Sequence, residues 1–186
     1  DQLLAEVAKT VLAPTLAALA AEGRPYRGVL YVGIMLTAEG PKVIEYNCRF
    51  GDPETEVVLP LLESDLYDIF IACATGSLDD VDIKWSSDAA VTVVMASSGY
   101  PTSRSDPSPI TGIDAATASG CTVFHAGTAT GDGEVVAAGG RVLAVTTLRP
   151  TLAEAADAAH EGVALISFDG AQHRADIARA TAEVRP

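Results

Sequence analysis

Residues 28–48 decide the fold. Within them, residues 28–36 read Gly-Val-Leu-Tyr-Val-Gly-Ile-Met-Leu, an uninterrupted apolar run of strand length. Residues 42–48, Lys-Val-Ile-Glu-Tyr-Asn-Cys, alternate apolar with polar side chains, which is typical of a strand with two different faces. Glu39-Gly40-Pro41 lies between the two and has the composition of a turn. The stretch therefore predicts an antiparallel hairpin.

Helices and further strands flank this hairpin. Apolar residues at helical spacing predict a helix over 2–22, in which Pro14 is expected to cause a kink or break and Gly23 to end the helix. After the hairpin, Asp52 has the character of an N-cap, with Pro53 at the first helical position. The other predicted elements are helices at 54–62, 64–75, 151–166 and 175–183, and strands at 89–97, 121–125, 133–138, 140–148 and 165–168.

The predicted fold class is α/β (α+β), in two portions. Residues 1–76 form the first portion, residues 77–88 are a polar linker, and residues 89–186 form a small α+β domain. Thr151 and Glu154 have the spacing of a capping box, which supports a helix that begins there.

The composition excludes several classes of function. The chain has 12 basic and 25 acidic residues and a net charge of −13, which argues against nucleic acid or an acidic membrane as a partner. We expect no apolar run of the roughly 18 residues that a membrane span needs. The three cysteines are widely spaced and form no Cys-x-x-Cys motif, so a reducing compartment is expected.

The second strand of the hairpin carries the chemistry. Glu45 and Asn47 project to the same side, about 7 Å apart along the strand, and Arg49 continues that face. Two oxygen ligands suit a hard divalent ion that also binds substrate phosphates, and a guanidinium can bind phosphate oxygens bidentately. This set of residues suits phosphoryl transfer. The alternative is that these three polar residues are the solvated face of the strand.

A resemblance adds to this interpretation. Residues 28–36 and the continuation Val-Ile-Glu45-Tyr-Asn47-Cys-Arg49-Phe-Gly-Asp52-Pro-Glu resemble the last part of the ATP-grasp domain in the phosphoribosylamine–glycine ligase family. Glu-x-Asn-x-Arg is shared with other ATP-grasp enzymes, whereas Cys48–Glu54 is far more specific. The resemblance returns at 94–101, 123–128, 139–143 and 173–177, and so extends over essentially the whole chain.

The resemblance implies a role for each residue of the motif. Mg²⁺ or Mn²⁺ would be held by Glu45 and Asn47. Arg49 would act in catalysis and bind the phosphates of ATP, and Asp52 would lie by the small-substrate pocket, where it could meet the glycine ammonium. The implied reaction joins glycine to phosphoribosylamine through a glycyl phosphate, in cytoplasmic purine biosynthesis. His173-Arg174 resembles the end motif of the family, which makes these two residues candidates for a contact to the ribose phosphate.

The resemblance also implies that the chain is partial. Members of the family are more than twice as long, so we expect this chain to be inactive alone. Leu30, Val32 and Ile34 are expected to expose apolar surface that an N-terminal half or a second copy would cover. Two alternatives are open: a non-catalytic structural or interaction fragment, and part of another ATP-grasp ligase or carboxylase. Residues 89–186 contain no lysine, which argues against a biotin or lipoyl carrier.

Overall fold

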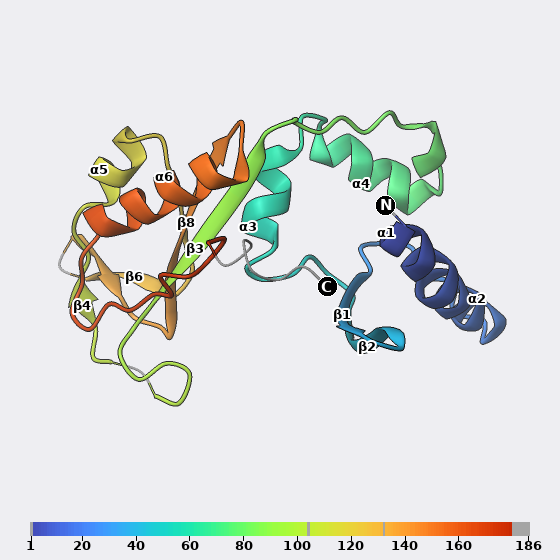
Figure 1. The fold of residues 1–186 in the computed structure, drawn as a ribbon, viewed down its shortest axis with the longest axis horizontal. Coiled ribbons are helices and arrows are strands. Elements are labelled where there is room, and N and C mark those ends of the chain that lie inside the picture. Colours follow the sequence, from blue (N-terminus) through green and yellow to red (C-terminus); the bar gives the residue numbers. More distant parts are fainter. Residues whose placement is uncertain (1, 104, 132, 180–186) are drawn as a thin grey trace. The chain divides into compact units, whose positions relative to one another are not determined.

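A computed structural model describes residues 2–103, 105–131 and 133–179. The chain forms two compact units. The first comprises Asp1–Gly51 with Ser64–Ile83, and the second comprises Asp52–Glu63 with Lys84–Pro186. The chain therefore passes from one unit to the other at Gly51, Glu63 and Ile83. The mixed helices and antiparallel sheets confirm the predicted fold class (Figure 1). The predicted boundaries at 77–88 stay a prediction.

The first unit begins with a continuous helical segment, and Pro14 does not break it. The segment consists of α1 (Gln2–Val7), a π-helical stretch (Ala8–Leu12) and α2 (Ala13–Ala21). Pro14 lies in the first turn of α2, just after the π-helical stretch. Proline has no amide hydrogen to donate, and the altered hydrogen bonding of a π-helical stretch accommodates this loss without ending the helix. Gly23 was predicted to end this helix, and its left-handed φ of +75° just past the helix end confirms that prediction.

This helical segment meets a criterion that the sequence expectation did not apply. Gln2–Ala21 is long and apolar enough to cross a membrane, judged by length and composition, and little of it is buried. The expectation considered uninterrupted apolar runs, whereas this segment tolerates a few charged and polar residues in an apolar average. Interior helices of globular proteins and signal sequences meet the same criterion, so the length and composition assign no membrane role.

The predicted hairpin is present, with one irregularity. Strands β1 (Tyr31–Thr37) and β2 (Gly40–Asn47) are antiparallel. Gly33 pairs with Glu45 and Ile34 pairs with Val43, so Ile44 is an extra residue in β2, a β-bulge. The bulge interrupts the strict alternation of faces before Glu45, but Glu45 and Asn47 follow it and keep the two-residue spacing that puts them on one face.

A short helical region completes the first unit. Helix α4 (Leu66–Thr75) begins at Asp65, whose carboxylate accepts a hydrogen bond of 2.8 Å from the Tyr67 amide, and ends at Gly76 with φ +78°. A 3₁₀ turn at Leu78–Asp80 follows. This matches the prediction of a helix at 64–75.

The second unit is built on a three-stranded antiparallel sheet of order β3-β8-β5. Its strands are β3 (Ala89–Ala96), β8 (Arg141–Arg149) and β5 (Thr122–His125). Helix α6 (Leu152–Leu165) packs on the sheet (Figure 1), and Thr147 Oγ1 donates a hydrogen bond of 2.6 Å to the Ala155 carbonyl across this contact. The predicted capping box of Thr151 and Glu154 starts α6.

Smaller elements surround this sheet. A second sheet has the order β4 (Ser108–Pro109), β7 (Glu134–Ala137) and β6 (Thr128–Gly131), and the helical pieces are α5 (Ile113–Ala118), α3 (Thr55–Val58) and a 3₁₀ turn at Leu59–Leu61. Side chains of β3, β8 and α6 supply most of the core: Val91, Val93, Met95, Val142, Leu143, Val145, Ala155, Ala159 and Val163.

In the second unit, two predicted elements are wrong or incomplete, and two strands were not predicted. No strand runs over 165–168: α6 continues to Leu165, and Ser167 forms only an isolated bridge with Thr111. The predicted helix at 175–183 is a series of turns up to residue 179, and its remainder lies outside the described residues. Strands β4 and β6 were missed, because their short, Gly- and Pro-flanked sequences have no clear two-residue period.

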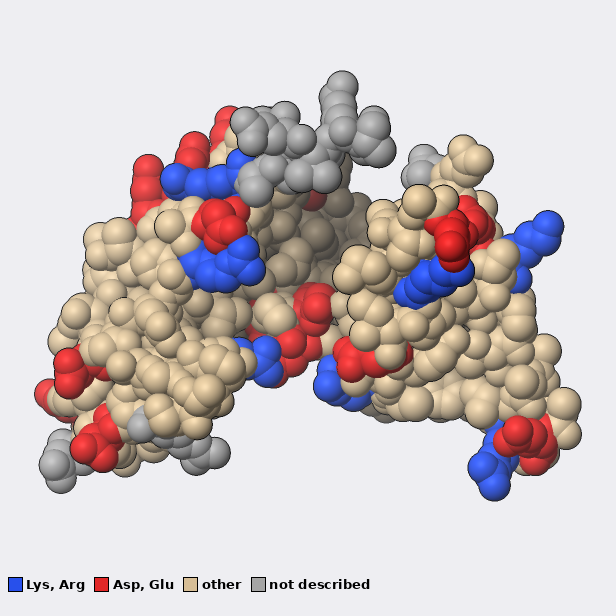
Figure 2. All heavy atoms as spheres, turned by 60° about the horizontal axis from the view of Figure 1, so that its bottom comes forward, with Lys and Arg blue, Asp and Glu red and all other residues tan. Residues whose placement is uncertain are grey.

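Charged side chains are spread over the surface. On the face drawn in Figure 2, the Lys and Arg side chains are separated from one another by acidic and uncharged residues.

Candidate functional site

The predicted metal pair lies on the last part of β2. The Nδ2 amide of Asn47 donates a hydrogen bond of 3.0 Å to Oε1 of Glu45. The opposite residue, Gly33, leaves room for Glu45, because a Cβ built on Gly33 would lie 3.1 Å from Cγ of Glu45. The backbone of β1 therefore supports the Glu45 side chain closely, and the hydrogen bond holds the Glu45 and Asn47 side chains beside each other.

This hydrogen bond leaves suitable oxygens for a cation. With Nδ2 of Asn47 facing Oε1 of Glu45, the amide oxygen Oδ1 and the second carboxylate oxygen Oε2 remain for an ion. Both are hard oxygen donors of the kind that Mg²⁺ and Mn²⁺ prefer. Among the described residues, no group of three or more His, Cys, Asp or Glu side chains could hold a metal. Two oxygen donors of this kind suit an ion that takes its other ligands from water and substrate phosphates.

Arg49 lies just beyond β2 and is exposed. Its Nη1 donates a hydrogen bond of 2.9 Å to the carbonyl of Phe50, and the Phe50 ring packs against Phe70 at 6.2 Å between centroids. Among the residues that the structure describes, this carbonyl is the one hydrogen-bond partner of the Arg49 guanidinium, so an anion can compete for it. Its assignment to phosphate stays a prediction.

The neighbouring Cys48 is a free, exposed thiol. The structure places it beside Tyr26, whose pKa is raised by desolvation and by a hydrogen bond to Cys48. Cys48 directly follows Asn47, the last residue of β2, so it lies where the chain leaves the hairpin.

The sequence predicted Asp52 as the N-cap of a helix, and this prediction is wrong. Helix α3 has Glu54 at its N-cap and no side-chain cap there. The carboxylate of Asp52 is used elsewhere: Nη2 of Arg141 lies 2.9 Å from Oδ2, and Nη1 of Arg141 donates a hydrogen bond of 3.1 Å to the Asp52 carbonyl. A charged partner on β8 takes the carboxylate in place of helix amides.

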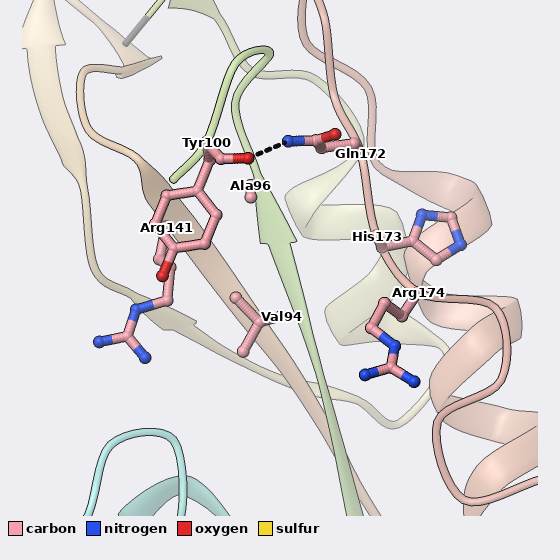
Figure 3. A pocket seen from close by; sticks show the side chains of 7 residues that line it. All are labelled: Val94, Ala96, Tyr100, Arg141, Gln172, His173 and Arg174. Carbon is pink, nitrogen blue, oxygen red and sulfur yellow. Dashed lines mark hydrogen bonds between the residues drawn. The ribbon is translucent and has the colours of Figure 1, made fainter. Parts of the chain in front are cut away.

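Arg141 also lines a pocket of about 340 Å³ in the second unit (Figure 3). The pocket is bordered by Val94, Ala96, Tyr100, Arg141, Gln172, His173 and Arg174. Nε2 of Gln172 donates hydrogen bonds to the carbonyls of Ser97 (2.9 Å) and Tyr100 (3.4 Å), which ties the 172–174 segment to the end of β3. Two guanidinium groups and an imidazole thus border one hollow.

Arg174 is preorganised by a carboxylate. Its guanidinium binds both oxygens of Asp176, and this hydrogen bond raises the pKa of Arg174. The same hydrogen bond lowers the pKa of Asp176, and the nearby His160 adds to that effect. Asp176 thereby orients the guanidinium of Arg174 beside the pocket.

Sequence reasoning missed the role of Arg141 and Tyr100. One signal was available in Gly139-Gly140-Arg141: a Cβ on Gly140 would lie 2.7 Å from the Tyr100 ring, so glycine is needed for that aromatic side chain to pack beside Arg141. The contact between Asp52 and Arg141 spans 89 positions, and nothing local predicts it.

Comparison with known proteins agrees with the arrangement of these motifs. Residues 1–55 match the family model for the ATP-grasp (A) domain of phosphoribosylglycinamide synthetase, and residues 90–180 match the model for its C domain. The chain is 52% identical to the trifunctional purine biosynthetic protein adenosine-3 of Gallus gallus, over 94% of this chain and 18% of that protein. It is 48% identical to phosphoribosylamine–glycine ligase of Streptomyces coelicolor, over 95% of this chain and 44% of the ligase.

A solved structure gives the same result for the fold. The crystal structure of phosphoribosylamine–glycine ligase from Thermotoga maritima superposes with a TM-score of 0.72 at 35% identity, over 88% of this chain and 40% of that chain. The chain thus spans less than half the length of these relatives. It belongs to the phosphoribosylamine–glycine ligase family, as a portion that contains the end of the ATP-grasp domain and the C domain.

Proposed function

We propose that this chain is the C-terminal portion of an ATP-dependent ligase that joins glycine to 5-phosphoribosylamine in cytoplasmic purine biosynthesis. The observation that carries the proposal is the Glu45–Asn47 pair, whose hydrogen bond leaves two oxygens for a divalent ion. ATP-grasp enzymes use ATP with such an ion, and Mg²⁺ or Mn²⁺ fits these ligands. When bound, the ion would neutralise phosphate oxygens of ATP.

The reaction has two steps. The carboxylate of glycine takes the γ-phosphoryl group of ATP, which yields ADP and glycyl phosphate. The amine of phosphoribosylamine then attacks the acyl carbon and expels phosphate. Arg49 would hold phosphate oxygens through its guanidinium, and Asp52 would accept a hydrogen bond from the ammonium of glycine.

The pocket beside Arg141 suits the second substrate. We infer that Arg174 binds the ribose phosphate there, because a guanidinium group matches phosphate geometry in two-point contacts. Arg174 is already oriented by Asp176, which lowers the entropic cost of binding an anion. In this assignment, residues 1–76 supply the metal and nucleotide contacts, 77–88 connect, and 89–186 hold the phosphoribosyl group.

The hairpin suggests how the chain is completed. Met35, Leu36 and Ile44 are 55%, 61% and 64% exposed, whereas the expected Leu30, Val32 and Ile34 are half-buried. In the described part of the first unit, only Val11 and Ala72 are buried hydrophobic residues. A unit with so small a core and so much exposed apolar surface needs a partner. We propose that the preceding part of an ATP-grasp domain covers this surface.

A chimera tests the proposed function. The matched segment of the Streptomyces coelicolor ligase is replaced by this chain, and ADP release is measured with ATP, glycine and phosphoribosylamine. We expect turnover that requires all three substrates, and none from the 186-residue chain alone. A well-folded chimera without turnover would contradict the proposal and favour a structural fragment.

A further inference from the structure

Arg141 contacts Asp52 at two points, and the backbone that carries Arg141 is held in place by the core of the second unit. One guanidinium binds both the carboxylate and the backbone carbonyl of Asp52. Arg141 begins β8, and the next two residues, Val142 and Leu143, are fully buried in the core. Such a fork fixes the direction of a carboxylate in a way that a single ammonium group cannot.

Stability does not account for this contact. The side chain of Arg141 is 36% exposed and that of Asp52 is 56% exposed. Ion pairs at such exposure contribute little to folding stability, since water solvates both charges well when they separate. The contact does restrict the conformation of Asp52, which is the first residue after the chain enters the second unit.

The contact also leaves part of Asp52 available. Arg141 occupies Oδ2 and the carbonyl, and Oδ1 has no hydrogen-bond partner among the described residues. Arg141 itself lines the pocket with Arg174 (Figure 3). A carboxylate oxygen is therefore held at a fixed place next to a guanidinium that borders the pocket.

We propose that Arg141 is a positioning residue, which holds Asp52 so that Oδ1 accepts a hydrogen bond from the amine of a substrate. The proposal rests on the proposed function, since that function supplies the amines. Glycine and phosphoribosylamine both carry a primary amine, and separate Michaelis constants identify which of them depends on Arg141. A displacement of about 1 Å in a substrate-binding group lowers turnover by about 10²-fold, so the contact matters even though it adds little stability.

The first test uses the active chimera. Arg141→Ala is expected to lower kcat/KM for one amine substrate by about 10²-fold and to leave the KM for ATP within about twofold. Arg141→Lys keeps the charge but loses the fork, so it should recover only part of this loss. Arg149→Ala, at the other end of the same strand, is the matched control and should have wild-type kinetics.

The second test uses the 186-residue chain and needs no activity. The ¹⁵N heteronuclear NOE of the Asp52 amide should be that of ordered backbone in the wild type and in Arg149→Ala, and should fall in Arg141→Ala. Thermal midpoints of all variants should agree, which excludes unfolding as the cause.

The outcomes separate the two proposals. A wild-type chimera without turnover contradicts the proposed function, and the NOE then decides alone whether Arg141 orders Asp52. If Arg141→Ala keeps kcat/KM within about threefold of wild type in an active chimera, the positioning role is overturned. It is equally overturned if activity falls while the Asp52 amide stays ordered, because Arg141 would then act directly on a ligand.

Discussion

Asn47 Nδ2 and Glu45 Oε1 are 3.0 Å apart on β2, two residues from each other along the strand. The amide of Asn47 thus fixes the carboxylate of Glu45 by a charge-assisted hydrogen bond. A ligand that is oriented before the ion arrives loses less side-chain entropy on binding. On the proposed metal assignment, this relationship would prepare the pair to hold an ion whose other ligands come from water and phosphate.

Glu45→Gln in the chimera tests the metal assignment. Removing the negative charge should weaken Mn²⁺ binding and lower turnover by about 10²-fold, since the ion neutralises the phosphate oxygens. Isothermal titration with Mn²⁺ and ADP release measure the two effects. Glu39→Gln, in the turn of the same hairpin, is the control, because the Glu39 carboxylate forms an ion pair with Lys42. Equal Mn²⁺ affinity in both variants would contradict the assignment.

Ile44→Lys tests whether the hairpin is covered by the preceding part of the ligase. Ile44 is the bulge residue and is 64% exposed in this chain. In the isolated chain the substitution should leave the free energy of unfolding nearly unchanged. In the chimera it should lower that free energy by about 2 kcal/mol or more, because a charged group enters a covered apolar contact. Urea unfolding measures both values.

The control for this prediction is Leu152→Lys, an exposed apolar residue at the start of α6. It should have the same small effect in both backgrounds. If Ile44→Lys also has the same effect in both, the hairpin is not covered.

Gly162→Ala tests the packing of α6 on the sheet. A Cβ at this position would lie 2.3 Å from Sγ of Cys121 and 3.1 Å from Cγ1 of Val145. Overpacking costs about 1–3 kcal/mol, and the better helix propensity of alanine returns up to about 1 kcal/mol. We expect a net loss of about 1 kcal/mol in the free energy of unfolding, measured in urea.

The double variant Cys121→Ala/Gly162→Ala identifies the cause of that loss. Removing the sulfur makes space for the new methyl group, so the double variant should be more stable than the sum of the two single effects predicts. Additive effects would show that Cys121 is not the obstacle.

Asp176 should titrate abnormally. Its pKa is lowered, chiefly by the hydrogen bond from Arg174, so a ¹³C NMR titration should give a midpoint below the usual value of about 3.9. Because the folded-state pKa is depressed, the pair stabilises the fold above the unfolded-state value, and this contribution is lost as the pH falls through the folded-state pKa. In Arg174→Gln the midpoint should return towards the usual value. An unchanged midpoint in that variant would contradict the pairing.

The hairpin and the capping box show what local sequence predicts well. Residues 28–48 have a two-residue period and a turn, and Thr151 with Glu154 has a cap spacing, so nearby residues hold all the information. The predicted strand at 165–168 failed for the opposite reason: a short apolar run fits a helix end as well as a strand, and packing of α6 on the sheet decides between them.

By itself, the sequence determined the Glu45–Asn47 pair, because strand periodicity puts residues two apart on one face. Only the tertiary structure decided the use of Asp52. Local rules made it a helix cap, whereas folding brings Arg141 from 89 positions away, and a guanidinium fork competes successfully for a carboxylate. Contacts between residues far apart in the sequence produce no periodic pattern in it. The contact between Asp52 and Arg141 therefore forms only when the sheet of the second unit brings the two residues together.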